Sequence, residues 1–247
     1  MPRCSARCTS SGTDSTSTRS RRELERTPLC HGASLGLHES QSRLWENLVG
    51  RSRAFWQFMY PSLARTFPEA LAGVDAESFY RAANKVQPSL IRVEADEATY
   101  SLHIILRFEL EQDMLQGRVS LKDLPATWSA RMKEYLGVDV PNDGQGVLQD
   151  VHWSGGMLGY FPTYALGSIH VGADLGAGDG RPARPPTSRS RAATLPRSRA
   201  WLGEKLHRHG RKFTPKEMIE RITGGPIRIE PFMNYLTGKF TDLYGLT

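Results

Sequence analysis

Three short stretches of the sequence combine residue types that could hold a metal, bind a carboxylate or stabilise an oxyanion. The first is LHESQSRLWENLVGRS, in which Glu39 and Arg43 are one helical turn apart. A pair at this spacing is commonly a simple ion pair on a helix surface. The many further polar groups beside Trp45, Leu48 and Phe55 instead favour a helix that serves a site.

The second stretch is IRVEAD, which contains Arg92 followed by two acidic residues. An arginine on a short extended segment that leads into a helix is suited to bind a carboxylate through two parallel hydrogen bonds. The alternative is an internal ion pair between Arg92 and a neighbouring glutamate. The residues alone leave both interpretations open.

The third stretch is GVLQDVHWSGGMLGYFPTYALGSIH, which is rich in glycine, aromatic and polar residues and is typical of a loop at a site. His152 could donate a hydrogen bond to an oxyanion, with Asp150 orienting the ring. Tyr160 or Tyr164 could supply a phenolic donor. A histidine beside a tryptophan is more often structural, so this motif taken alone supports either interpretation.

The elements that must position these residues are mainly helices. PSLIRVE, residues 88–94, alternates briefly and predicts a short extended segment. Residues 214–217, Thr-Pro-Lys-Glu, match a capping box with proline at the first helical position. Apolar spacing and capping residues predict helices over about residues 37–59, 75–84, 97–116, 123–137, 215–224 and 231–245. Ser34 is the predicted N-cap of the first of these helices. The predicted apolar face of the third consists of Leu102, Ile105, Leu106, Leu110, Met114 and Leu115.

The composition divides the chain into four parts. Residues 1–24 and 172–199 are rich in Arg, Ser, Gly and Pro and lack hydrophobic periodicity. They are expected to be disordered, or misread in the wrong reading frame of a GC-rich gene. Residues 25–171 are expected to form a helical core that carries the site motifs, and residues 200–247 the C-terminal helices of the same domain.

Charge and cysteine content narrow the function classes. The two arginine-rich segments carry more than the whole net charge of +6 and leave the rest of the chain slightly negative, so a folded basic surface for nucleic acid is not expected. No apolar stretch is long enough to span a bilayer. Three cysteines, Cys4, Cys8 and Cys30, do not make a disulfide framework, which favours a reducing, cytoplasmic compartment. A zinc knuckle built from them and His31 is less favoured than unpaired thiols.

Taken together, the three stretches resemble the carboxypeptidase Taq family of zinc metallocarboxypeptidases. The resemblance rests on GASLGLHESQSRLWEN, SLIRVEADE and VLQDVHWSGGMLGYFPTYALGS, which occur in the family's order, and covers about residues 27–171 and 200–246. It implies a mainly α, single-domain zincin-type fold. It further implies a cytosolic homodimer that removes C-terminal residues from peptides with one divalent cation, normally Zn²⁺.

The resemblance also implies roles for particular residues. Glu39 becomes a metal ligand, and Arg92 becomes the anchor for the terminal carboxylate of the peptide substrate. Catalytic roles are implied for His152 and Tyr160. Substrate-binding roles are implied for Gln149, Asp150 and Tyr164.

The sequence departs from the family at the metal site. It contains no HExxH motif, and no two of its seven histidines are four residues apart. One carboxylate does not hold zinc, and the glutamate that activates water is missing as well. The chain is therefore expected to be the C-terminal part of such an enzyme, to retain no zinc and to be inactive alone. The alternative is a non-catalytic fragment that binds peptide C-termini or dimerises.

Overall fold

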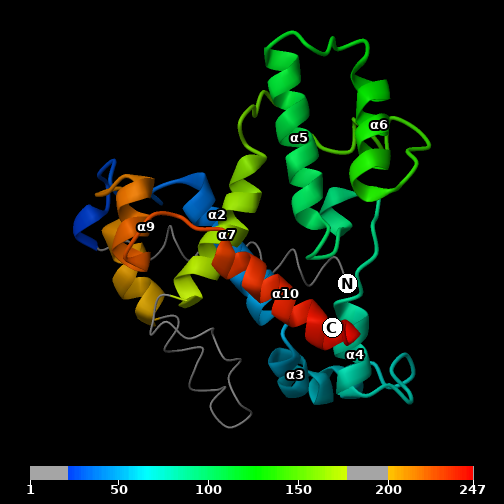
Figure 1. The fold of residues 1–247 in the computed structure, drawn as a ribbon. Helices are drawn as coiled ribbons and strands as arrows, with labels where there is room; N and C mark the ends of the chain where they lie inside the picture. Colours follow the sequence, from blue (N-terminus) through cyan, green and yellow to red (C-terminus); the bar gives the residue numbers. More distant parts are fainter. Residues whose placement is uncertain (1–21, 177–199, 247) are drawn as a thin grey trace. The chain divides into compact units, whose positions relative to one another are not determined.

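A computed structural model of the protein describes residues 22–176 and 200–246, and no strand occurs within them. The expected mainly α fold is confirmed (Figure 1). No helix in these two ranges is long and apolar enough to cross a membrane. Residues 200–205 are also helical. The named elements are η1 (Arg22–Leu24), α2 (Leu35–Arg43), η2 (Leu44–Val49), α3 (Arg53–Thr66), α4 (Ala76–Ala83), η3 (Arg92–Glu94), α5 (Tyr100–Leu115), α6 (Leu124–Leu136), α7 (Pro162–Gly176), η4 (His207–His209), α9 (Pro215–Thr223) and α10 (Glu230–Tyr244).

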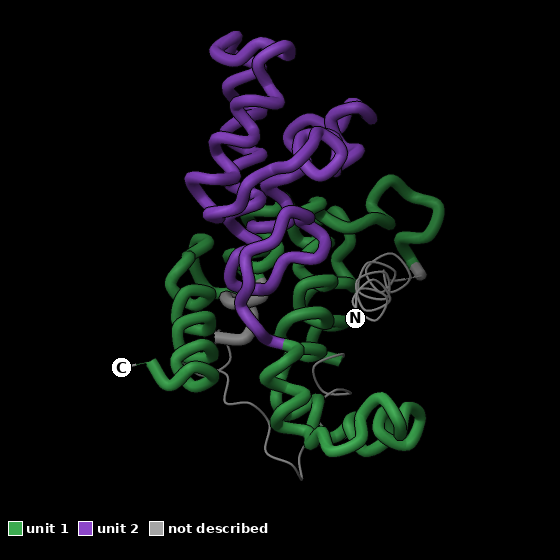
Figure 2. Tube along the Cα trace, turned by 90° about the vertical axis from the view of Figure 1, so that its right-hand side faces the viewer, with its two compact units in different colours: residues 1, 3–83, 166–247 green, residues 2, 84–165 purple. Residues whose placement is uncertain are grey.

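The chain folds into two compact units (Figure 2). The first contains the described residues up to Ala83 and those from Leu166 onward, and the second contains residues 84–165. The boundary falls within α7. The segments predicted to be disordered or misread, 1–24 and 172–199, lie mostly outside the described residues. At their edges, η1 is a 3-10 turn and α7 extends to Gly176.

The first unit has a hydrophobic core between α2, residues 200–206 and α9. Its buried members are Leu37, Leu202, Leu206 and Met218. Each aliphatic side chain buried in this way contributes about 1.5–3 kcal/mol relative to exposure. Helix α9 begins with the predicted capping box, in which the Thr214 hydroxyl accepts from a backbone N–H and the glutamate three residues on accepts from the Thr214 backbone.

The helix predicted over residues 37–59 is interrupted. Its start is confirmed, because Ser34 Oγ accepts a hydrogen bond from Leu37 N at 3.1 Å. After α2 the chain forms the π-helical turn η2, and α3 begins only after Ser52, whose Oγ accepts from Phe55 N at 3.1 Å. The apolar period continues through the break, but a serine that can cap a new helix competes with continuation of the old one.

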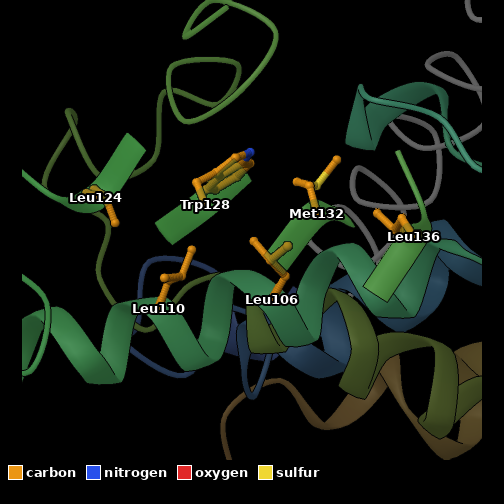
Figure 3. Packing of buried hydrophobic residues seen from close by; sticks show 6 residues of the cluster. All are labelled: Leu106, Leu110, Leu124, Trp128, Met132 and Leu136. Carbon is orange, nitrogen blue, oxygen red and sulfur yellow. The ribbon is translucent and has the colours of Figure 1, made fainter. Parts of the chain in front are cut away.

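The core of the second unit lies between α5 and α6 (Figure 3). Helix α6 has the predicted limits, because Pro125 lies in its first turn and Gly137 ends it with a φ of 69°. Figure 3 shows side chains of the two helices facing one another across this core. The six buried residues of the cluster are Leu106, Leu110, Leu124, Trp128, Met132 and Leu136.

Helix α5 buries most of the expected apolar face, including Leu106 and Leu110, and in addition a polar face that was not expected. Ile105 and Leu115, which were expected in the core, are 42% and 64% exposed. Beside the apolar face the helix also buries His103, Arg107 and Glu111, which follow one another at four-residue steps. Residues four apart share one face of a helix, so these three form a polar stripe. The loop at residues 145–161 accounts for the difference, because its polar groups are the partners of Arg107 and Glu111.

The short extended segment predicted over residues 88–94 does not continue to its end, since the backbone is extended at Ile91 but not at the next three residues. Arg92 begins the 3-10 turn η3 instead. Just beyond, the Asp96 carboxylate accepts hydrogen bonds from Gln87 N at 3.0 Å and from Thr99 N at 2.9 Å. A carboxylate that gathers backbone N–H groups bends the chain locally, and an isolated alternation of seven residues has no neighbouring strand to oppose this.

Close packing of α2 against α7 generates a stability prediction. A Cβ on Gly167 would lie 3.0–3.1 Å from the Glu39 backbone and side-chain carbons. We expect Gly167→Ala to lower the free energy of unfolding by about 1–3 kcal/mol through overpacking. The matched control is Gly203→Ala, which meets open space within a helical segment and should be neutral or stabilising by about 1 kcal/mol. Urea unfolding of both variants measures the difference; equal stability would show that the two helices are not packed this closely.

Candidate functional site

Arg92 and Asp150 form the centre of a buried polar cluster in the second unit. Arg92 Nη2 lies 2.6 Å from Asp150 Oδ1, and Arg92 Nε lies 3.0 Å from Oδ2. The other terminal nitrogen, Nη1, donates to the Tyr100 hydroxyl at 2.9 Å. Arg92 is therefore part of an internal ion pair, but its partner is Asp150 and not the adjacent Glu94, which is exposed.

A second arginine, Arg107 of α5, shares the same carboxylate. Its Nε donates to Asp150 Oδ2 at 2.7 Å, its Nη2 to Gln149 Oε1 at 2.8 Å, and its Nη1 to the His103 carbonyl at 2.9 Å. None of its side chain is exposed. Arg107 was not predicted as a site residue from the sequence. The signal in the sequence was the position of this arginine inside the apolar run LHIILRF. An arginine on the buried face of a helix is rare unless a carboxylate or another acceptor pairs with it.

Gln149 connects the two arginines to the backbone. Its Oε1 accepts from Arg92 N at 2.9 Å as well as from Arg107, and its Nε2 donates to Leu90 O at 2.9 Å and Gln145 O at 3.0 Å. The carboxamide thus has partners on both sides within the protein. Gln149, predicted to bind substrate, here fixes the turn that carries Arg92.

The cluster carries an excess of positive charge, because two guanidinium groups share one carboxylate. Burial opposes ionisation of Asp150, but the hydrogen bond from Arg92 and the charge of Arg107 outweigh it and lower the pKa of Asp150. Burial lowers the pKa of Arg107 to about 10, which leaves it protonated at neutral pH. Burial likewise opposes the charge of Arg92, yet the bond to Asp150 prevails and raises its pKa.

His152 lies beside this cluster in a pocket of aromatic rings. Its Nε2 is 3.1 Å from the Tyr164 hydroxyl, and its Nδ1 is 3.7 Å from Asp150 Oδ1. The ring lies against Phe161, with centroids 4.5 Å apart, and near Tyr160 at 5.3 Å. Burial, and secondarily the charge of Arg92, lowers the pKa of His152. A neutral imidazole can donate one hydrogen bond without adding charge.

The two tyrosines belong to the same wall. The Tyr164 ring centroid lies 4.9 Å from Arg92 Cζ, a cation–π contact, and the Tyr160 and Tyr164 rings are 5.4 Å apart. Six of the predicted site residues, Arg92, Gln149, Asp150, His152, Tyr160 and Tyr164, therefore lie together within the second unit.

Glu111 is a further buried carboxylate that the sequence analysis missed. It accepts hydrogen bonds from Trp153 Nε1 at 2.8 Å and from Gly159 N at 2.5 Å. Gly159 has a φ of 75°, a conformation that favours glycine. Glu111 therefore holds the loop that follows His152 against α5.

Glu39, the predicted metal ligand, lies on α2 in the first unit. It is 8% exposed, and its Oε1 is 3.2 Å from Arg43 Nε. Arg43 also pairs with Glu46, at 3.3 Å. No group of three or more His, Cys, Asp or Glu side chains is arranged to hold a metal ion in the part of the chain that the structure describes. The described residues thus do not fit a zinc ion, and the role of Glu39 stays a prediction.

Comparison with known proteins identifies this class of fold. A crystal structure of the M32 carboxypeptidase from Deinococcus radiodurans superimposes with a TM-score of 0.89 at 45% identity, covering 97% of this chain and 48% of that one. Metallocarboxypeptidase 1 from Trypanosoma cruzi aligns with a TM-score of 0.86 at 35% identity, covering 94% of this chain and 48% of that one. The helical fold is that of metallocarboxypeptidases.

The sequence gives the particular family. The profile of the Carboxypeptidase Taq (M32) metallopeptidase family matches residues 16–240, so the chain belongs to this family. Thermostable carboxypeptidase 1 from Thermus thermophilus is 43% identical over 226 residues, which are 89% of this chain and 42% of the relative. For carboxypeptidase 1 from Bacillus subtilis the identity is 39%, over 90% of this chain and 44% of the relative. The chain thus spans less than half the length of these relatives.

The buried histidines generate a prediction about pH. Burial lowers the pKa of His103 and of His207 to about 4, so each is neutral in the folded chain. Unfolded histidine binds a proton near pH 6.5. Because the unfolded chain binds more protons, stability should fall as the pH drops from about 6.5 to 4.

Replacement of His103 by Asn should reduce the loss of unfolding free energy on acidification by about 1–3 kcal/mol. Urea unfolding at pH 7, 5.5 and 4.5 measures this free energy. The control is His31→Asn, because His31 is exposed. A slope that His103→Asn leaves unchanged would contradict the assignment of acid sensitivity to this residue.

Proposed function

We propose that this chain provides the part of a metal-dependent carboxypeptidase that binds the substrate's terminal carboxylate, and that it does not hydrolyse peptides alone. The observation that carries the proposal is the buried cluster of Arg92, Asp150 and Arg107, with two positive charges for one negative. Membership of the M32 family supports the wider activity, the removal of C-terminal amino acids from peptides.

The guanidinium of Arg92 retains an edge for a ligand. Asp150 takes the side formed by Nε and Nη2, and the Tyr100 hydroxyl takes one N–H of Nη1, so one N–H of Nη1 and one of Nη2 remain as donors. A carboxylate can receive two parallel hydrogen bonds at such an end. The rings of Tyr100, Phe161 and Tyr164 within about 6 Å of Arg92 Cζ provide apolar surroundings in which these bonds gain strength.

His152 and Tyr160 are proposed to act at the reacting carbonyl. A neutral His152 ring with its proton on Nε2, which lies 3.1 Å from the Tyr164 hydroxyl, can donate a hydrogen bond to the oxygen on which negative charge develops. Tyr160 lies against the same ring and offers a phenolic hydroxyl. Gln149 and Asp150 act on the substrate through the position that they give Arg92.

The proposed inactivity follows from the missing metal ligands. Zinc would supply the polarised water for hydrolysis, and in this family Glu39 would be one of its ligands. The chain has no HExxH motif that would add two imidazoles and a general base.

We further infer a cytoplasmic, reducing location from the low cysteine content, in which Cys30 is unpaired. Self-association of the chain through its helices, with no nucleic acid or membrane partner, is the alternative role.

The carboxylate site makes a binding prediction. N-benzyloxycarbonyl-Ala-Phe should bind the full chain at least about tenfold more tightly than its C-terminal amide, because only the acid can pair with Arg92. Arg92→Met should remove this preference without unfolding the chain, since Asp150 keeps Arg107 as its partner. Calorimetric titration, or quenching of tryptophan fluorescence, measures both affinities.

The matched control is Arg118→Met, because Arg118 pairs with Asp113 at the surface of the same unit and its side chain is 54% exposed. This variant should bind both ligands as the wild type does. A wild-type chain that binds acid and amide equally would overturn the proposed function.

A second prediction concerns turnover. The purified chain incubated with zinc should release no phenylalanine from the same blocked dipeptide, and it should carry far less than one zinc per chain. The thermostable carboxypeptidase 1 of Thermus thermophilus, assayed alongside, is the positive control. Release of phenylalanine that a chelator abolishes would show that the chain is an enzyme by itself.

A further inference from the structure

Arg92 alone cannot give the site a positive charge, because Asp150 neutralises it through two short hydrogen bonds. We infer that Arg107 is a positioning residue that supplies the net charge of the carboxylate site and holds Asp150 and Gln149 in place, although it never touches the ligand. The inference rests on the proposed function, which it deepens by assigning a role to a residue outside the sequence motifs.

Arg107 has no free access to a ligand. Its side chain is fully buried, and its three nitrogens already donate to Asp150, Gln149 and the His103 carbonyl. One face of its guanidinium lies 4.6 Å from the Trp128 ring centroid, and Phe161 is 5.4 Å away. Its effect on a ligand must therefore pass through its charge and through Asp150 and Gln149.

The other ionisable groups among the described neighbours lie outside this cluster of two guanidinium groups and one carboxylate. The pKa values of His103 and His152 are lowered, chiefly by burial, so both rings are neutral at pH 7. The carboxylates of Asp96 and Glu111 accept backbone, hydroxyl or indole donors. Neither forms an ion pair with either arginine within the described part of the unit, so the cluster itself holds two positive charges and one negative charge.

Loss of the Arg107 charge would leave a neutral Arg92–Asp150 pair. An incoming carboxylate would then meet the attraction of Arg92 and the repulsion of Asp150 at similar distances. A unit charge about 7 Å away at an effective dielectric constant of about 20 changes affinity by about ten- to fiftyfold. A change of that size separates a site that selects acids from one that barely distinguishes acid from amide.

The test compares the affinity ratio of N-benzyloxycarbonyl-Ala-Phe to its amide in the full chain and in three variants. Arg107→Lys keeps the charge and should keep most of the preference. Arg107→Gln removes the charge and should reduce the ratio about tenfold or more. The double variant Arg107→Gln/Asp150→Asn leaves Arg92 as the single charge of the cluster, so its ratio should recover.

Recovery of the affinity ratio in the double variant shows that the charge of Arg107 matters and not its structural support. The double variant lacks more native hydrogen bonds than Arg107→Gln does, so a purely structural role would predict a further loss. The inference is overturned if Arg107→Gln keeps the wild-type ratio, or if the double variant stays at the level of Arg107→Gln. Circular dichroism checks folding. If Arg107→Gln does not fold, the test rests on Arg107→Lys and the double variant. Both must still bind the acid more tightly than the amide, and loss of this preference in either variant overturns the inference. Equal binding of acid and amide by the wild type would instead overturn the proposed function itself.

Discussion

The sharing of the Asp150 carboxylate between two buried guanidinium groups is the interaction on which the second unit depends. Burying three charges is costly unless each is paired at close range. Here the distances of 2.6–2.7 Å from Asp150 to Arg92 and Arg107 meet that condition. The same pairing joins the η3 turn, helix α5 and the loop that leads to His152. One carboxylate thereby ties together three segments that are far apart in the sequence.

Helix α5 is the rigid support of this arrangement. One face contributes Leu106 and Leu110 to the core with α6, and an adjacent face presents Arg107 and Glu111 to the loop. Packing against α6 fixes the axis of the helix, so the polar side chains are held as firmly as the apolar ones. A binding loop supported in this way has well-defined positions without a sheet beneath it.

The parts of the fold that could be predicted from the sequence are those that depend on near neighbours. The N-caps at Ser34 and Thr214 and the stop at Gly137 use residues within one turn, and all three are confirmed. The site motifs could be recognised, but Arg107 could not be assigned, because its partner is 43 residues away. For the same reason the polar face of α5 and the 3-10 turn at Arg92 escaped prediction: both are determined by tertiary contacts.

The π-helical turn at Leu44–Val49 has a consequence for the spacing of the chain. A π-helical turn accommodates about one residue more than an α-helical turn. Removal of a single residue from this turn would restore the ordinary helical pitch. Helix α2, Glu39 included, would then rotate by about 100° relative to the residues that end the turn. The number of residues in this turn, independently of their identity, therefore sets the direction in which α2 presents Glu39.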